Sequence, residues 1–281
     1  DWDCNEFDIY DVELTGPSYH TYIYEYDCRP EVTLDVKQIE GKPEDVTDQK
    51  YPTVITLRNF SVDGGHFGKS NSLLSLLQAN AGKLDFNNFY FEDISLSVKN
   101  LKYHDEEGLT LDLKKLSAID NTGFPIHEIS CDAILINGTN ATLPNYSISL
   151  GETLIKNKFS LSYLSFDAFK NFTNEVILNA TFDETKIYVR DIEHFLPSIS
   201  NSNFIKNNED EYIEISGRYF GKIANIAGRD VDFKFGDKLS LAGSFNTRNL
   251  LDTDNAVLNI KLDRFQTSMR KIKMLFPNFN L

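Results

Sequence analysis

Apolar and polar residues alternate along most of the chain, which is the pattern of β-strands that bury one face. The stretch Gly108–Phe169 shows it most clearly. It begins with the letters GLTLDLKKL, in which Leu109, Leu111 and Leu113 share one face and the residues between them are polar or charged. A turn signal follows at Asn121–Gly123. We therefore predict a half-buried strand, a turn, and further strands of the same kind.

The alternation continues to the end of the chain, so the predicted strands share one apolar side. Between residues 129 and 135, Ile129, Cys131, Ala133 and Leu135 are expected on the same face. The residues predicted to form this face, besides the three leucines above, are Ile129, Leu135, Phe159, Leu161, Tyr163, Leu178, Ile187, Val189, Val231, Phe233, Phe235, Leu239, Leu241, Leu258, Ile260 and Leu262.

The phase of the alternation slips by one residue in two strands. One slip lies between Val98 and Leu101, and the other between Tyr163 and Leu164. A one-residue slip is what a β-bulge produces, and bulges bend and twist a sheet. We therefore predict a sheet that curls.

The first 28 residues predict two strands joined by a turn at Thr15–Ser18. Cys4 and Cys28 are equally distant from Gly16, so a hairpin at this turn would place them opposite each other. A disulfide between them and two free thiols are both compatible with this spacing. A bridge would require an oxidising compartment.

Short helices interrupt the strands. The segments 191–199 and 268–279 each read as a brief helix that stops at a proline. A further short helix is expected near Leu73–Ala79, after a glycine-rich turn at 64–70. That turn contains Gly68-Lys69-Ser70, but a phosphate-binding loop would need glycine where Asp63 stands.

The composition narrows the function classes. The chain has 281 residues, a formal net charge of −14, and 21 Phe and 13 Tyr against 2 Met, which favours a folded, strand-rich protein. Phosphate binding needs clustered Lys and Arg, so nucleic acid is not an expected partner. No apolar run approaches the about 18 residues of a membrane span, and the chain begins at Asp1, so we expect any membrane anchor to lie outside it.

No motif nominates a catalytic residue, a metal site or a cofactor. The five histidines are scattered without metal-binding spacing, and no GxSxG nucleophile motif occurs. Acidic runs such as Asp105–Glu107 are typical of charged turns. We therefore expect a protein that is not an enzyme and holds no cofactor or metal.

Several segments occur in an order that resembles a known family. They are LTLDLKKLSAIDNTGF, LPNYSISLGETLIKNKFSLSYLSFDAF, TKIYVRDIEHFLPSI and EISGRYFGKIANIAGRDVDFKFGDKLSLAGSF. This order resembles the N-terminal portion of the TamB proteins of Bacteroidetes, which belong to the AsmA-like superfamily. The similarity runs from about Lys83 to the end, and Ala118-Ile119-Asp120 departs from the more charged family pattern. Residues 1–82, a β-rich part with one short helix, match only in general strand character, and we expect them to continue into residues 83–281.

The resemblance implies a periplasmic protein anchored in the inner membrane of a Gram-negative bacterium. It implies a mostly β fold, in which an elongated, curled antiparallel or mixed sheet forms an open groove with a few short helices. The apolar residues above would then line a groove for phospholipid acyl chains. The family also implies an Omp85-type outer-membrane barrel protein as partner, and a role in outer-membrane protein assembly and secretion.

Other functions agree with the same alternation. A β-sandwich adhesion or carbohydrate-binding module at a cell surface would bury the same residues between two sheets. A hydrolase with a distributed site is a further hypothesis, although no motif favours it. Periodicity does not separate a groove from a sandwich, because every strand has one dry face in both.

Overall fold

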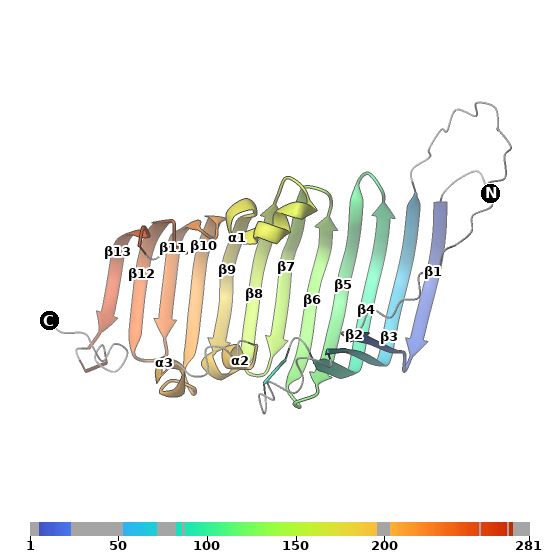
Figure 1. The fold of residues 1–281 in the computed structure, drawn as a ribbon, viewed down its shortest axis with the longest axis horizontal. Coiled ribbons are helices and arrows are strands. Elements are labelled where there is room, and N and C mark those ends of the chain that lie inside the picture. Colours follow the sequence, from blue (N-terminus) through green and yellow to red (C-terminus); the bar gives the residue numbers. More distant parts are fainter. Residues whose placement is uncertain are drawn as a thin grey trace.

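The part of the chain that the structure describes folds into one sheet of 13 strands, with a few short helices between them (Figure 1). This computed structural model describes residues 6–23, 53–71, 83–85, 88–195, 203–252, 254–268 and 270–271. The strands are β1 (Glu6–Thr15), β2 (Ser18–Ile23), β3 (Val54–Asn71), β4 (Phe89–His104), β5 (Gly108–Asp120), β6 (Pro125–Ile136), β7 (Asn140–Leu150), β8 (Thr153–Ser162), β9 (Ile177–Tyr188), β10 (Tyr212–Lys222), β11 (Asn225–Phe235), β12 (Leu239–Arg248) and β13 (Val257–Thr267).

The sheet is open and mixed. From β3 to β13 each strand lies antiparallel to the next one in the sequence, so the strands follow one another in a row (Figure 1). β1 and β2 pair with β3 in parallel, and β1 and β13 are the outermost of the described strands in this row. The predicted fold class, a mostly β protein with an open mixed sheet and few short helices, is confirmed. Because β3 pairs with β4, the described parts of residues 1–82 and 83–281 share this sheet.

The predicted hairpin at Thr15–Ser18 is wrong. Gly16 has a φ of 62° and the chain kinks there, but β2 continues in the direction of β1 along the same neighbour, β3. Gly16 N–H donates to the Asp63 carbonyl at 2.7 Å, so β3 holds the kink. The hairpin that would have set Cys4 opposite Cys28 is therefore not formed. Both cysteines lie outside the described residues.

The glycine-rich turn expected at residues 64–70 is also wrong, because β3 runs through it to Asn71. The register against β4 shifts on both sides of Gly65, so the two glycines accommodate a bulge within the strand. The short helix predicted near Leu73–Ala79 lies outside the described residues.

Cross-strand partners point to the same side of a sheet, so the register shows which residues share a face. One row of partners is apolar from β9 to β12, namely Ile187, Ile213, Phe235 and Leu239, and it ends at Thr267 on β13. The adjacent row is Lys186, Glu214, Lys234, Ser240 and Gln266. We call the side of the first row the apolar face and the side of the second row the polar face.

The apolar face continues across the sheet to the N-terminal strands. Leu113 is paired with both Val98 and Cys131, and Leu161 with both Ala141 and Leu178. No second sheet covers this face among the described residues, since all their strands belong to the one sheet. The two packed sheets that the β-sandwich hypothesis requires are therefore not observed in the described part of the chain.

Bulges explain where the predicted phase holds and where it fails. The slip expected between Val98 and Leu101 is confirmed: Asn100 has a φ of 51° and the register with β5 shifts around it. A bulge that the alternation did not reveal lies at Ala133, which has a φ of 54°. It turns Leu135 to the polar face, where its partners are Thr110 and Thr142. The prediction that Leu135 shares the face of Ile129 is therefore wrong.

The slip expected at Tyr163–Leu164 is not a bulge. β8 ends at Ser162, and the chain leaves the sheet into the 3-10 helix η1 (Phe166–Asn171) and helix α1 (Phe172–Glu175). Helices α2 (Val189–Phe195) and α3 (Asn203–Lys206) lie at the opposite ends of the strands (Figure 1). The helix predicted at 191–199 is confirmed as far as Phe195. Of the one predicted at 268–279, only the helical residues 270 and 271 are described beyond Ser268.

Candidate binding face

Exposure of the apolar face rises towards β13. Val98, Leu161 and Val231, on strands with neighbours on both sides, are 8%, 8% and 5% exposed. On β13, Leu258 and Ile260 are both 56% exposed, since nothing described lies beyond this strand. The face therefore passes from a packed centre to an open apolar margin.

The structure places the predicted face residues in four groups. Leu161, Tyr163, Val189, Val231 and Phe235 are buried; Leu109, Leu111, Leu113, Ile129, Phe159, Leu178, Ile187, Phe233, Leu239 and Leu241 are half-buried; Leu258, Ile260 and Leu262 are exposed; and Leu135 lies on the polar face.

Tyr163 and Val189 lie beyond the ends of their strands and close the face instead of lining it. Tyr163 packs with Ala168 of η1, and its hydroxyl donates to the Asn137 carbonyl at 2.7 Å. Val189 begins α2 and packs against Ile205 and Phe235. We call the segment η1–α1 the first end cap and α2 the second end cap.

The first end cap covers the apolar face near the end of β8. Ala168 and Val176 are 3% and 1% exposed and belong to one cluster with Leu161. The Ala224 N–H, after β10, donates to the Thr173 carbonyl at 3.1 Å. This cap therefore ties β8, β9 and β10 together at one end.

The second end cap is fixed by a buried carboxylate. Asp191 is 4% exposed, and its Oδ2 accepts hydrogen bonds from the backbone N–H groups of Glu152 and Thr153, both at 2.9 Å, and from the Thr153 hydroxyl at 2.7 Å. Glu152 lies in the turn between β7 and β8, and Thr153 begins β8. Gly151 has a φ of 53°, and a Cβ there would lie 2.5 Å from Asp191. The turn and the helix therefore fit only with glycine at this position.

A buried pair attaches the same helix to β5. His194 Nε2 lies 2.6 Å from Asp120 Oδ2, and the His194 ring stacks on Phe124 with ring centroids 4.1 Å apart. Burial opposes ionisation of Asp120, but hydrogen bonds from Thr122, Phe124 and His194 outweigh it and lower the pKa of this carboxyl. Residues 83–85 lie beside α2 as well, because the Leu84 N–H donates to the His194 carbonyl at 3.1 Å.

This pair makes stability depend on pH. Because the pKa of Asp120 is lower in the folded chain than in the unfolded chain, its ionised form stabilises the fold. The contribution is present above the ordinary aspartate pKa of about 3.9 and is lost as the pH falls through the folded value. We expect the free energy of unfolding of D120N to fall less on acidification below pH about 4 than that of the wild type. Urea unfolding at a series of pH values measures this difference, and parallel curves would contradict it.

An open hollow of about 450 Å³ lies on the apolar face at β11–β13. Its lining side chains are Ile226, Leu241, Phe245, Thr247, Leu250, Leu258, Ile260, Leu262 and Phe265. Apart from the Thr247 hydroxyl, which is already hydrogen-bonded to the backbone of Ile226, these side chains are apolar. The hollow can cover hydrocarbon and offers little to a polar ligand.

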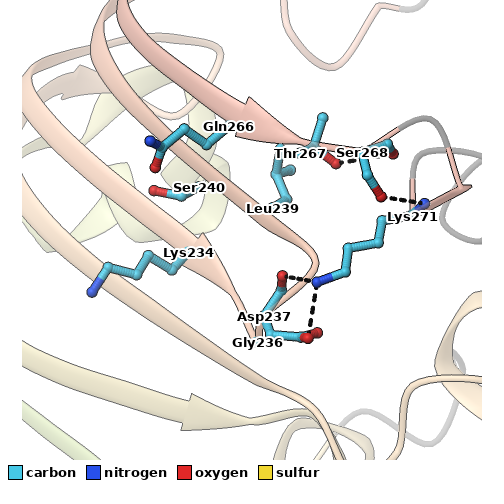
Figure 2. Close-up of a pocket in the computed structure, with 9 residues that line it drawn as sticks. All are labelled: Lys234, Gly236, Asp237, Leu239, Ser240, Gln266, Thr267, Ser268 and Lys271. Carbon is cyan, nitrogen blue, oxygen red and sulfur yellow. Dashed lines mark hydrogen bonds and ion pairs between the residues drawn. The ribbon is translucent and has the colours of Figure 1, made fainter.

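A second hollow, of about 400 Å³, lies at the turn between β11 and β12 (Figure 2). Lys271 reaches Asp237 there, with Nζ 2.8 Å from the carboxylate and 2.6 Å from the carbonyl oxygen. Lys234 extends away from Lys271 in Figure 2 and donates to Glu214 at 2.8 Å on the polar face. Both cations are therefore already neutralised.

Cys131 is the buried cysteine of the apolar face. Burial, with the charges of Asp132 and Asp112, raises its pKa to about 11, so the thiol stays protonated and is a poor nucleophile at neutral pH. Its Sγ lies 3.3 Å from the Pro144 carbonyl oxygen.

Among the described residues no group of three His, Cys, Asp or Glu side chains could hold a metal ion. None of the described helices is long and apolar enough to cross a membrane.

A hydrogen-bonded group of polar residues on the apolar face was not predicted: Tyr146, Asn157 and Thr185 on β7, β8 and β9. Asn157 pairs with Tyr146 in the register, and its amide donates to the Tyr146 hydroxyl at 2.7 Å. The Thr185 hydroxyl donates to the Asn157 side-chain oxygen at 3.2 Å. The signal was present in the sequence, because Asn157 alternates in phase with Phe159 and Leu161 and interrupts their apolar series.

No protein-family model, curated protein or solved structure matches this chain. The proposals below therefore rest on its own residues and geometry, together with the resemblance in motif order described above.

Proposed function

We propose that this chain is a periplasmic segment of a TamB-like protein whose apolar face holds phospholipid acyl chains during transfer between the inner and outer membranes. One observation carries the proposal. The apolar face is continuous across the sheet, and no second layer of strands covers it among the described residues. Each CH₂ group moved from water onto such a face gains about 0.8 kcal/mol, so acyl chains are ligands of matching chemistry.

The wider setting of this proposal comes from the family resemblance. In that setting the protein is anchored in the inner membrane by a segment outside this chain and acts with an Omp85-type outer-membrane barrel protein. Support for outer-membrane protein assembly and secretion belongs to the same proposal. The chain would act by covering hydrocarbon and would perform no chemical step.

Loss of the exposed apolar margin tests this proposal. We expect the triple variant L258S/I260S/L262S to lose several-fold in phospholipid capture while staying folded, because these side chains are about half exposed and lie on the last described strand. Capture is measured with vesicles of zwitterionic phosphatidylcholine carrying a fluorophore on one acyl chain. Zwitterionic lipid avoids repulsion by the net charge of −14.

The matched control is V257S/N259S/K261S, which changes alternate residues of the same strand on the polar face. Their partners are Arg248, Asn246 and Ser244. This control is expected to capture lipid like the wild type. Equal loss in both variants, or no capture by the wild type, would overturn the proposed function.

A further inference from the structure

The hydrogen bonds of Tyr146, Asn157 and Thr185, which we call the polar triad, leave two hydrogens without an acceptor among the described residues: that of the Tyr146 hydroxyl and the second hydrogen of the Asn157 amide. The Tyr146 hydroxyl accepts from Asn157, and Asn157 in turn accepts from Thr185. The hydrogen of the Tyr146 hydroxyl finds no acceptor among the described residues. Burial raises the pKa of Tyr146, and the hydrogen bond from Asn157 lowers it by less. The hydroxyl therefore stays protonated at neutral pH.

The polar triad is not explained by a need for stability. Asn157 and Thr185 are 3% and 4% exposed, and apolar residues of similar shape at such sites are often nearly neutral for stability when all partners are replaced together. Along β8, Asn157 is followed on the apolar face by Phe159 and Leu161. These polar groups satisfy each other only in part, so the Tyr146 hydroxyl can still donate a hydrogen bond to a ligand.

The charges around the polar triad limit the chemistry of that ligand. Lys156 and Lys158 flank Asn157 but lie on the polar face, where their partners are Ser147 and Thr181. The triad thus presents an oriented, neutral donor without a cation beside it. A phosphate would require charge-assisted partners. An ester carbonyl oxygen accepts a neutral hydrogen bond and lies where the acyl chain joins the glycerol backbone, so it fits.

We propose that the polar triad binds the ester carbonyl of a phospholipid, with the Tyr146 hydroxyl as donor. This inference rests on the proposed function and adds a position to it: Tyr146 and Asn157 lie in the middle of β7 and β8, and Thr185 lies near the end of β9 that leads into the second end cap. The acyl chain would lie along the neighbouring apolar side chains while the carbonyl is held at Tyr146. A bound lipid would thereby pause at a defined point of the face.

The test compares diester phosphatidylcholine with its diether analogue of equal chain length, which lacks the carbonyl oxygens. We expect the wild type to bind the diester about fivefold more tightly, the size of one neutral hydrogen bond. Tyr146→Phe should abolish this preference and leave diether binding unchanged. Tyr219→Phe is the matched control, because Tyr219 lies on the same face and its hydroxyl already faces the Ser216 carbonyl. It should keep the preference.

A second measurement needs no variant. In the wild type, isotope-edited infrared spectra of phosphatidylcholine with ¹³C-labelled ester carbonyls should show the bound carbonyl at lower frequency than in hydrocarbon solvent. An unshifted carbonyl, or a diester preference that survives in Tyr146→Phe, would overturn the inference. Equal binding of diester and diether by the wild type would overturn this inference alone. Binding of neither would overturn the proposed function with it.

Discussion

Replacing Asp191 by alanine is expected to lower the free energy of unfolding by about 3 kcal/mol. The variant removes one carboxylate that accepts hydrogen bonds from the Glu152 and Thr153 N–H groups and from the Thr153 hydroxyl. Thr153 is 3% exposed, so its donors would be left without water or a replacement acceptor. Chemical denaturation measures the loss, and amide hydrogen exchange should speed up at Glu152 and Thr153.

Asp167→Ala is the matched control for this experiment. Asp167 lies on the first end cap and pairs with Lys170 at 2.6 Å, but both side chains are at least 80% exposed. Exposed ion pairs contribute about 0 to 1 kcal/mol, so the control should unfold almost like the wild type. If D191A were as stable as D167A, the carboxylate would not be what holds the second end cap.

Gly108→Ala is expected to cost about 3 kcal/mol or more of stability. Gly108 opens β5 with a φ of 95°, a conformation that residues with a Cβ rarely adopt. The added Cβ would lie 2.2 Å from the Ile136 carbonyl oxygen and 2.8 Å from the Asn137 Cα. These are backbone atoms of the adjacent strand and turn, so the clash is relieved only by moving the strands apart.

Gly138→Ala provides the comparison, because Gly138 stands in the adjacent turn between β6 and β7, where an added Cβ would have no atom within 4 Å. We expect its free energy of unfolding to change by less than about 0.5 kcal/mol. Thermal and urea unfolding of both variants measure the contrast. Similar losses at the two positions would show that backbone freedom in this region, and not the close approach at Gly108, limits stability.

Alternation in the sequence predicted the strands and most of the apolar face, because side chains on a strand point to opposite sides in turn. Leu109, Leu111 and Leu113 follow that rule directly. Leu135 does not, since the bulge at Ala133 uses a positive φ that is unusual for alanine and leaves no turn signal in the sequence. A local pattern predicts which residues alternate, but a single unmarked bulge reverses the face of those that follow.

Pairing partners were the harder part to predict. Gly16-Pro17 has the composition of a hairpin turn, yet β1 and β2 both lie along β3, which begins far along the chain. The second end cap also depends on a contact between residues far apart in the sequence, since His194 contacts Asp120 at the end of β5. The polar triad was visible only as an asparagine in an apolar series. The asparagine is Asn157, and its hydrogen bonds could not be predicted because the strand register brings Tyr146 and Thr185 beside it.

The order of the strands bears on how the chain folds. From β3 to β13 every strand pairs with its neighbour in sequence, so each hairpin can add to the one before it without waiting for distant segments. Such local topology favours rapid, stepwise growth from one end to the other. Besides the pairing of β1 and β2 with β3, the contacts of α2 are an exception, because they join His194 to Leu84 and Asp120. The contacts of α2 can form only after β9 has joined the sheet, because α2 directly follows β9. Their formation would therefore mark the completion of the sheet from β5 to β9.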